Sequence, residues 1–361
     1  MASTLENTRK WLNETATAGS TSAGNVATLN RVILPVIRRV MPTVIANELV
    51  GVQPMTGPVG QIHTLRVRYA DSSDGNEVGE EALSPFKIAA AYSGNATDAT
   101  PKGSATAALE GAAGKRMSIQ ILKQTVEAKT RKLSARWTFE AAQDAQAQQG
   151  IDIEAEIMAA LAQEITAEID QEVLASLRAL AGTQNQQAYD QNAVSGTATF
   201  VGDEHAALAV MINRVANNIA QRTRRGAGNY AVVSPHALTI LQSATTSAFA
   251  RTTEGAFEAP TNTKMVGTLN SAMKVYVDSY ANDSTAILVG YKGSSESDAP
   301  AFYCPYIPLM SSGVVLDPSS FEPVVSFMTR YGYVELNNTA SSLGNAADYL
   351  GTVTIANVTF S

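Results

Sequence analysis

The sequence predicts an α+β fold, and three observations lead to that prediction. Apolar residues recur every three or four positions over residues 153–181, which is the period of an amphipathic helix. Residues 61–70 alternate apolar and polar side chains, as half-exposed strands do. Beyond residue 206, helical stretches alternate with short apolar strands, a pattern typical of a compact layered domain. A long helix, long exposed strands and a layered domain are therefore expected in one chain.

The composition supports a globular protein with a sizeable core. Of the 361 residues, 45% are hydrophobic and 16% are charged, and the net charge is −7. An acidic chain with few charges is a poor candidate for tight capture of a phosphate backbone. Neither a signal-peptide core nor an apolar run of membrane-spanning length is present. We expect no membrane partner, and a chain that stays in the cytosol where it is made.

The first part of the chain predicts an arm followed by a helix. Residues 1–32 are rich in small polar residues and poor in large apolar ones, so they cannot pack a core alone and need a neighbour to become ordered. From Ile33 to Ile45 apolar residues return at helical spacing. Pro42 predicts a kink or an end to this helix, because proline lacks the N–H and clashes with the preceding turn.

Residues 61–70 and 118–140 predict two long strands, and the low-complexity stretch 71–114 between them predicts a loop. Together they would form a projecting hairpin. The apolar face of the second strand changes sides near Arg131, which predicts a bulge or a sharp twist there. The hairpin is basic in an acidic chain, so it is either a solvated edge that discourages aggregation or a finger laid on an acidic neighbouring subunit. Its basic residues include Arg66, Arg68, Lys129 and Arg131.

The strongest helix prediction covers residues 153–181, which would be roughly 43 Å long at about 1.5 Å per residue. Asp152 is placed to cap its first turn, and Gly182 is placed to end it. One face carries a row of glutamates at intervals of four. Like charges at that spacing repel, so a basic partner is expected for this face. The row consists of Glu164, Glu168 and Glu172.

The remainder predicts a layered domain after a loose connector at 183–203. Residues 302–360 then alternate strongly and are expected to return as strands that pack beside the long helix. The layered domain is expected as helix 206–224, strand 230–234, helix 235–242, a loop to residue 265, and strands 274–278 and 286–291.

No residue set predicts enzyme chemistry, a metal or a cofactor. The histidines at 63, 205 and 236 stand far apart, without a histidine or cysteine at ligand spacing. Cys304 is the single cysteine, so no intramolecular disulfide can form, and it is expected to be a small buried hydrophobe. We therefore expect a structural protein that is not an enzyme and that binds no cofactor.

Several blocks of the chain, in order, resemble the major capsid proteins of T-even-like tailed phages. The blocks are NELVGVQPMTGPVGQIHTLRVRY from Asn47, VEAKTRKLSARWTFEAAQDAQAQQGIDIEAEI from Val126, VYVDSYA from Val275, ILVGYKGSS from Ile287, FYCPYIPL from Phe302 and FMTRYGYV from Phe327. The resemblance runs from about residue 33 to residue 358, and ordered blocks are more specific than a single motif. It implies a Hong Kong 97-type capsid fold.

The resemblance also implies a division of the chain. Its parts would be an N-terminal arm (1–32), a peripheral domain with a spine helix (33–60 and 141–202), an E-loop hairpin (61–140), an axial domain (203–300) and a return to the peripheral domain (301–361). The loop 245–265 would line the centre of a hexamer.

The implied function is that of a major capsid protein. It would assemble with itself into hexameric capsomers of an icosahedral head that encloses double-stranded DNA, with pentamers left open. Vertex, portal, scaffold and decoration proteins are the further partners that the resemblance implies, with weak non-specific proximity to packaged DNA. The chain would assemble in the host bacterial cytoplasm and reside in the virion capsid. An encapsulin-like cage holding cargo proteins is the alternative, and a soluble α+β enzyme is a third class.

Two sets of site residues follow from the resemblance. Leu12-Asn13-Glu14 resembles the site cut by the prohead protease of these phages, so Glu14 is a candidate for maturation cleavage, with chance occurrence as the alternative. The basic hairpin is expected to meet the acidic row of the long helix in an adjacent subunit. The candidate contacts are Arg66, Arg68, Lys129 and Arg131 on one side and Glu164, Glu168 and Glu172 on the other.

Overall fold

The structure is a computed structural model, and its chain falls into two compact units. The smaller unit contains residues 135–160 and 314–325, and the larger unit contains the other described residues. The structure describes residues 44–72, 77–82, 92–94, 103–111, 113–150, 152–181, 185–191, 201–244, 249–251, 265–336 and 346–357. The expected arm, most of the helix expected from Ile33, and Glu14 lie outside these residues.

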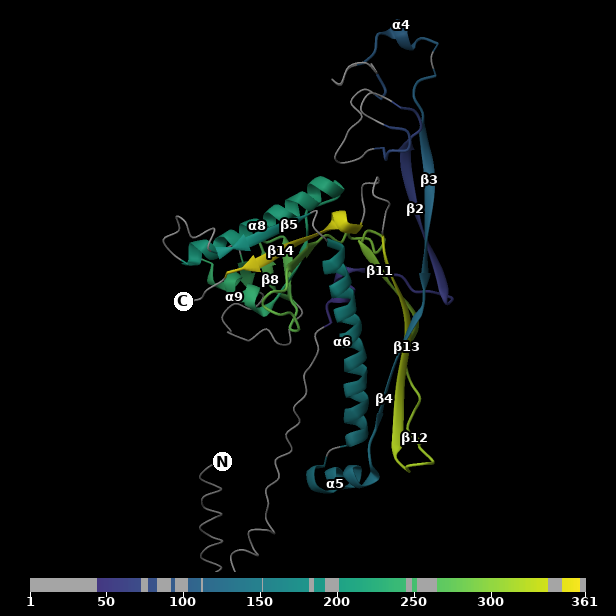
Figure 1. Ribbon diagram of the computed structural model, residues 1–361, viewed down its shortest axis with the longest axis vertical. Helices are drawn as coiled ribbons and strands as arrows, with labels where there is room; N and C mark the ends of the chain where they lie inside the picture. The colour runs from purple at the N-terminus through teal and green to yellow at the C-terminus, as the bar shows by residue number, and fades with distance from the viewer. Residues whose placement is uncertain are drawn as a thin grey trace, which may run out of the picture. The chain divides into compact units, whose positions relative to one another are not determined.

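A mixed seven-stranded sheet forms the centre of the larger unit, in the order β5-β14-β10-β6-β9-β8-β7 (Figure 1). The pairs β6/β9 and β5/β14 are parallel, and the other neighbours are antiparallel. Its strands are β5 (Gln186–Asp190), β6 (Tyr230–Val233), β7 (Phe249–Arg251), β8 (Met265–Leu269), β9 (Met273–Val277), β10 (Ile287–Gly290) and β14 (Leu350–Ala356).

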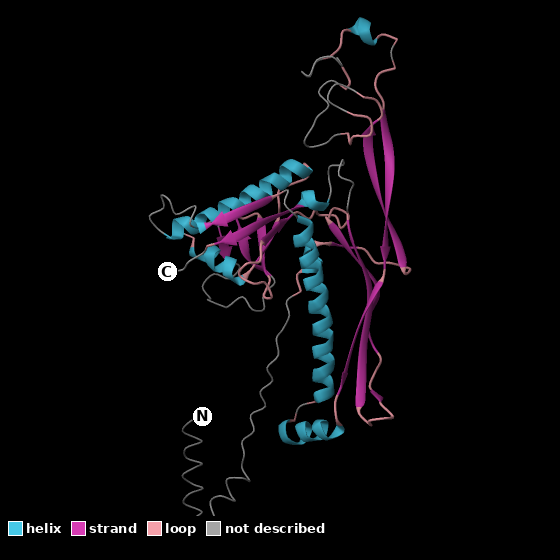
Figure 2. Ribbon diagram, viewed as in Figure 1, coloured by secondary structure: helices cyan, strands magenta, loops and turns pink. Residues whose placement is uncertain are grey.

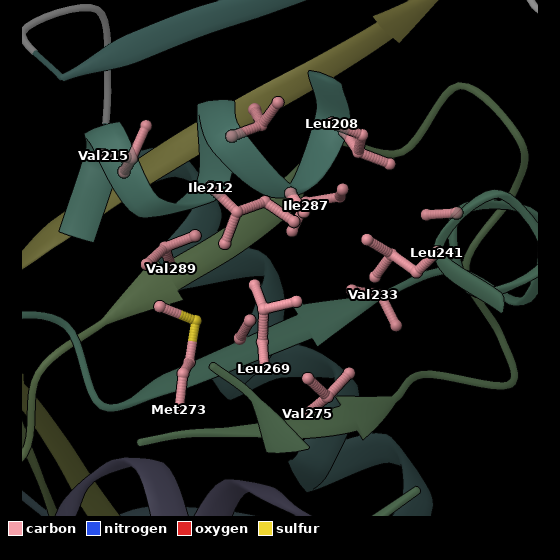
Figure 3. Close-up of a cluster of buried hydrophobic side chains, with 14 of the residues drawn as sticks. Leu208, Ile212, Val215, Val233, Leu241, Leu269, Met273, Val275, Ile287 and Val289 are labelled. Carbon is pink, nitrogen blue, oxygen red and sulfur yellow. The ribbon is translucent and has the colours of Figure 1, made fainter. Parts of the chain in front are cut away.

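Both faces of this sheet are buried. Helices α8 (Val201–Thr223) and α9 (Pro235–Ser243) pack on one face, where Figure 3 shows Ile212 and Leu241 directed toward Val233 and Ile287. Helix α3 (Ala46–Leu49) and the second half of α6 pack on the other face, against Tyr230 and Leu288 among others. Strands that are covered on both sides need consecutive apolar residues, which explains the runs YAVV in β6 and ILVG in β10.

Local signals in this sheet region agree with the structure. Ser234 caps α9, because its Oγ accepts a hydrogen bond from the N–H of Ala237 at 3.2 Å, and Pro235 occupies the first turn. The expected helices and strands between residues 206 and 291 are confirmed, with ends that shift by a few residues. β7 was not expected, because residues up to 265 were predicted as a loop.

The expected hairpin is confirmed in its first half. Strand β2 (Val59–Tyr69) pairs antiparallel with β3 (Met117–Glu127), from Val59 opposite Glu127 to Tyr69 opposite Met117. Figure 2 shows this pair as a long two-stranded ribbon. Residues 103–111 of the connection between the two strands include the short helix α4 (Thr106–Leu109).

The prediction of one strand over residues 118–140 is wrong in its second half. The N–H of Ala128 donates to the carbonyl oxygen of Pro58 at 2.9 Å, which closes the hairpin ladder. The chain then continues as β4 (Lys129–Arg136), which pairs with β13 (Pro323–Glu335) and not with β2. The change of apolar face that predicted a bulge near Arg131 therefore marks a change of partner strand, three residues earlier.

Strand β13 belongs to a sheet of order β1-β11-β13-β12, with β4 also on β13. Its other members are β1 (Gly51–Val52), β11 (Ala301–Ser311) and β12 (Val315–Leu316). Gly51 is required for the parallel pairing of β1 with β11, since a Cβ there would lie 2.3 Å from the carbonyl oxygen of Glu296 and 2.8 Å from the ring of Phe302.

Helix α6 (Ile153–Ala181) is confirmed with the bounds that the sequence predicted. The carboxylate Oδ1 of Asp152 accepts hydrogen bonds from the N–H groups of Glu154 at 3.1 Å and Ala155 at 3.5 Å, so Asp152 is the expected cap.

The smaller unit contains a helix where the sequence predicts, in part, a strand. Helix α5 (Phe139–Gln149) begins at Thr138, whose Oγ1 accepts from the N–H of Ala141 at 3.3 Å, and it ends at Gly150 with a φ of 67°. The same unit holds the start of α6, β12 and the turn that leads into β13.

Two further segments differ from the sequence-based division. Residues 186–190 form β5, where a loose connector was expected. After the short helix η1 (Ala346–Tyr349), β14 pairs with β10 and β5. Residues 350–356 thus join the strands of the expected axial domain, although they were expected to return to the long helix with the strands before them. Pairing between segments this far apart in sequence leaves no local signal.

Candidate subunit interface

Four side chains from three elements of the larger unit form one polar network, which we call the Arg131 network. Arg131 of β4 donates from Nη1 to Glu168 Oε2 at 2.7 Å and from Nη2 to Glu172 Oε2 at 2.5 Å. Its Nε donates to the hydroxyl of Tyr331 on β13 at 2.7 Å. The Tyr331 hydroxyl in turn donates to Glu172 Oε2 at 2.5 Å. The network therefore ties β4 and β13 to helix α6.

The charged side chains of the Arg131 network stabilise one another. Burial acts to raise the pKa of Glu172, but the hydrogen bonds from Tyr331 and Arg131 outweigh it, and the pKa falls below its ordinary value. Burial, together with the neighbouring Glu172 carboxylate, raises the pKa of Tyr331 to about 12. Hydrogen bonds to Glu172 and Tyr331 raise the pKa of Arg131. At neutral pH Arg131 is therefore a cation, Glu172 is a carboxylate and Tyr331 is a neutral phenol.

From the sequence, the basic residues of the hairpin were predicted to contact the glutamate row of an adjacent subunit. In the structure Arg131, Glu168 and Glu172 belong to one chain. Tyr331 was not predicted as a contact residue, although its place in the alternating segment after residue 302 indicates a strand side chain on an inner face. Glu164 and Lys129, the other candidates near this network, are both exposed.

Arg66 and Arg68 lie on one face of the β2–β3 hairpin, opposite Gln120 and Ser118. Arg66 is buried, and its Nη1 lies 2.7 Å from Glu81 Oε2. Arg68 is half-buried and forms a backbone bridge with Glu81. Other residues of the same chain therefore cover part of this face. Its two arginines are less exposed than expected for a basic hairpin that contacts a neighbouring subunit.

The opposite face of the hairpin is apolar and exposed. Leu65 and Ile121 stand directly across the ladder from each other and are 63% and 66% exposed. Ile119 and Met117 continue the same face and are also exposed. We call these four residues the apolar hairpin face. This face was not predicted, because the charges of the hairpin are its most prominent feature in the sequence, although the alternation of apolar residues in β3 indicates it. Contiguous exposed apolar side chains are typical of protein contacts.

Histidines and the cysteine were the remaining candidates for chemistry. Within the described residues, no group of three or more histidine, cysteine, aspartate or glutamate side chains is arranged to hold a metal ion. His205 is buried, hydrogen-bonds through Nδ1 with Ser243, and has a pKa lowered by burial. Burial also raises the pKa of the Cys304 thiol. In the same part of the chain, no helix is long and apolar enough to cross a membrane.

The architecture matches solved phage capsids. The structure described as "Capsid structure of the Cyanophage P-SCSP1u" aligns with a TM-score of 0.57 at 12% identity, covering 94% of this chain and 96% of that one. "The capsid of Myoviridae Phage XM1" aligns with a TM-score of 0.52 at 11% identity, over 94% and 99% of the two chains. The fold is therefore that of a phage capsid subunit, the Hong Kong 97-type fold expected from the sequence.

Proteins that are similar in sequence lead to the same class of protein. "Major capsid protein" of Vibrio phage KVP40 is 30% identical, covering 91% of this chain and 81% of its own length. "Major capsid protein" of Enterobacteria phage T4 is 29% identical, over 92% and 80% of the two chains. The family described as Major capsid protein Gp23 matches residues 26–113 and 96–355. The chain belongs to this family of tailed-phage major capsid proteins, which are structural proteins that assemble into a shell.

Proposed function

We propose that this chain is the repeating subunit of an icosahedral phage head, that it assembles as hexamers, and that the head encloses double-stranded DNA. Family membership and the capsid fold support a shell subunit. The observation that carries the proposal within the structure is the apolar hairpin face, an exposed surface that a chain acting alone would leave in water. Pentamers, vertex, portal, scaffold and decoration proteins, and assembly in the bacterial cytoplasm belong to the same proposal.

The proposal assigns a role to each part. The β2–β3 hairpin serves as the E-loop, α6 as the spine helix, and the seven-stranded sheet as the axial domain. The division departs from the sequence-based one in two places: β5 and β14 join the axial sheet, and the hairpin ends at Glu127, after which β4 pairs with β13. The segment 245–265, of which residues 249–251 and 265 are described, is proposed to face the centre of the capsomer.

Electron microscopy of particles from the purified chain tests this function. Closed shells with six-fold capsomers are expected, and nuclease-protected DNA is expected in particles taken from infected cells. Particles filled with protein cargo and free of nucleic acid would instead support the encapsulin-like alternative.

The charged candidates for contacts between subunits are proposed in a modified form. Lys129 and Glu164 are exposed, and Arg68 is half-buried, so these three are proposed to contact neighbouring subunits. Arg131, Glu168, Glu172 and Arg66 already have partners in their own chain. Exposed pairs contribute only about 0.2 to 1 kcal/mol each, so their effect depends on repetition over the shell.

Cleavage after Glu14 is proposed as a maturation step, on the basis of the Leu12-Asn13-Glu14 pattern alone. The intact mass of the subunit from mature particles tests it. A chain that begins at Thr15 is expected, and a chain that retains Trp11 would contradict the step.

A further inference from the structure

Residues 205–253 are a basic stretch in an acidic chain. They contain five arginines and neither a lysine nor an acidic residue, whereas the whole chain has a net charge of −7. In the structure they include most of α8, together with β6, α9 and β7, which are two strands of the seven-stranded sheet and the helices on one of its faces. A local charge opposite in sign to that of the whole chain indicates a partner with negative charge.

Helix α8 has a buried apolar face and an exposed polar face. Its apolar side chains belong to the core shown in Figure 3. The exposed face carries Arg214, Asn217 and Gln221 at intervals of three and four residues. Arg224 follows directly after the last residue of the helix and is also exposed. We call these four residues the basic helix face.

Arg214 presents a positive charge to solvent. The acidic residues of α8 are Asp203 and Glu204 in its first turn, and α9 contains none. Arg214 is ten residues after Glu204, which is roughly 15 Å along the helix at about 1.5 Å per residue. Among the described residues, no carboxylate forms an ion pair with Arg214. Its guanidinium is therefore available to a partner outside the chain.

Two nearby arginines have structural roles instead. Arg222 Nη1 lies 3.4 Å from Asp348 Oδ1, and Arg225 Nη1 lies 2.7 Å from Asp298 Oδ1. Both arginines are at the C-terminal end of α8, where basic side chains also complement the helix dipole. Arg214 is in the middle of the helix, where neither reason applies.

The chemistry of the basic helix face fits a phosphate backbone. Arginine and side-chain amides are groups that donate hydrogen bonds to phosphate oxygens. Protein interfaces are centred on aromatic or large apolar anchors, and this face has none among its four residues. A DNA duplex carries one charge per about 1.7 Å of its axis, so Arg214 and Arg224, roughly 15 Å apart along the helix, can both reach phosphates whatever the base sequence.

The basic hairpin fits this partner less well. Its Arg66 is paired with Glu81, and its neighbour Arg131 on β4 is paired with Glu168. Their charges are already neutralised within the chain, whereas Arg214 has no such partner among the described residues.

We propose that the basic helix face lies on the inner side of the shell and contacts the phosphate backbone of packaged double-stranded DNA, without regard to base sequence. The inference rests on the proposed shell function, which supplies the DNA. A contact with so few arginines is weak for one subunit and weakens further as the salt concentration rises.

Chemical protection in whole heads tests the proposal. Phenylglyoxal modifies accessible guanidinium groups, and mass spectrometry of peptides locates each modified arginine. We expect Arg214 and Arg224 to react several-fold less in DNA-filled heads than in heads from which the DNA has been released.

A matched pair of variants tests the same face in the purified subunit. Arg214→Gln should weaken the binding of a random-sequence duplex several-fold, measured by fluorescence anisotropy at low salt. It should also lower the slope of log affinity against log salt concentration by about 1. Lys274→Gln is the control, because Lys274 is an exposed cation on β9 of the same sheet.

Contrary outcomes are distinct. If Arg214 reacts equally in filled and emptied heads and is accessible in both, the proposal is wrong while the shell function stands. Protection in both kinds of head means that a protein surface covers the face, and this also overturns the proposal. Equal weakening in the two variants would show general charge attraction and contradict the assigned face. If heads contain no DNA, the proposed function itself fails, and this proposal fails with it.

Discussion

At the scale of single residues, a buried ion pair joins the last turns of α6 to the end of β9. Asp278 is 1% exposed and accepts hydrogen bonds from Arg178 Nη2 at 2.8 Å, Gln171 Nε2 at 3.0 Å and the N–H of Tyr280 at 3.1 Å. A buried pair contributes little compared with apolar packing of the same volume, but loss of one partner leaves an uncompensated charge.

We expect Arg178→Met to lower the free energy of unfolding by about 3 kcal/mol, near the lower end of the range for breaking a buried pair. The double variant Arg178→Met with Asp278→Asn should recover part of that loss, because no buried charge is then unpaired. Urea unfolding of the purified subunit gives both values. Equal losses in the single and double variants would show that Asp278 is not the reason for the effect.

At the scale of elements, the Arg131 network is the polar connection from β4 and β13 to α6. Arg131→Ala should lower the free energy of unfolding by about 1 to 2 kcal/mol, because three charge-assisted contacts are lost and Arg131 remains 31% exposed to solvent screening. Lys132→Ala is the matched control, since Lys132 is the next residue of β4 and is exposed. A loss of the same size in the control would contradict a specific role for the network.

The same network has a pH dependence with a definite sign. The pKa of Glu172 lies below its ordinary value of 4.5 in the folded chain, so its stabilisation is fully present above about pH 4.5. It is lost as the pH falls through the lowered pKa. The stability difference between the unmodified chain and Arg131→Ala should therefore be constant from about pH 5 to 7 and shrink below about pH 4. A difference that grows on acidification would contradict this assignment.

A substitution at Gly51 tests how much the pairing of β1 with β11 contributes to stability. A side chain there meets the backbone carbonyl of Glu296, which cannot move as a flexible side chain does. Gly51→Ala should lower the stability by about 1 to 3 kcal/mol, as overpacking generally does. Gly57→Ala is the control, because a Cβ at Gly57 meets no atom closer than 3.9 Å. Thermal unfolding of the two variants makes the comparison.

The elements that the sequence predicts well are those whose signals are local. Helix α6 has a complete apolar period and a capping aspartate, so its bounds were predicted. Helix α5 was missed because its apolar face is weak, although Thr138 and Gly150 carry ordinary capping signals. The polar strand β5 exists only through pairing with β14, about 165 positions away in the chain. The glutamate row was predicted as the partner of Arg131, but in an adjacent subunit, whereas Glu168 and Glu172 of the same chain bind Arg131. A sequence pattern shows that opposite charges are available and does not show which chain supplies them.

At the scale of the whole molecule, a change in the apolar hairpin face is expected to affect assembly of the shell and not folding of the subunit. Ile121→Ser should leave the unfolding of the subunit nearly unchanged, because Ile121 is exposed in the single chain, and should reduce the yield of shells several-fold. Val210→Ser is the control, since Val210 is an equally exposed apolar residue (67%) on α8. Sedimentation of assembly reactions measures the yield. Equal yields from both variants would remove the hairpin face from the interface.

The change of strand partner at Ala128 also decides how the hairpin transmits force. Tension along β3 passes through one residue into β4, a strand of eight residues that pairs with β13. Tension along β2 reaches β1, which is held to β11 over only Gly51 and Val52 and by two further bonds from Gln53 and Met55. The hairpin is thus attached to its subunit through a strand of eight residues at one end and a strand of two residues at the other. We expect a neighbouring subunit that pulls on the hairpin to separate β1 from β11 first, while β4 keeps the hairpin attached to its own subunit.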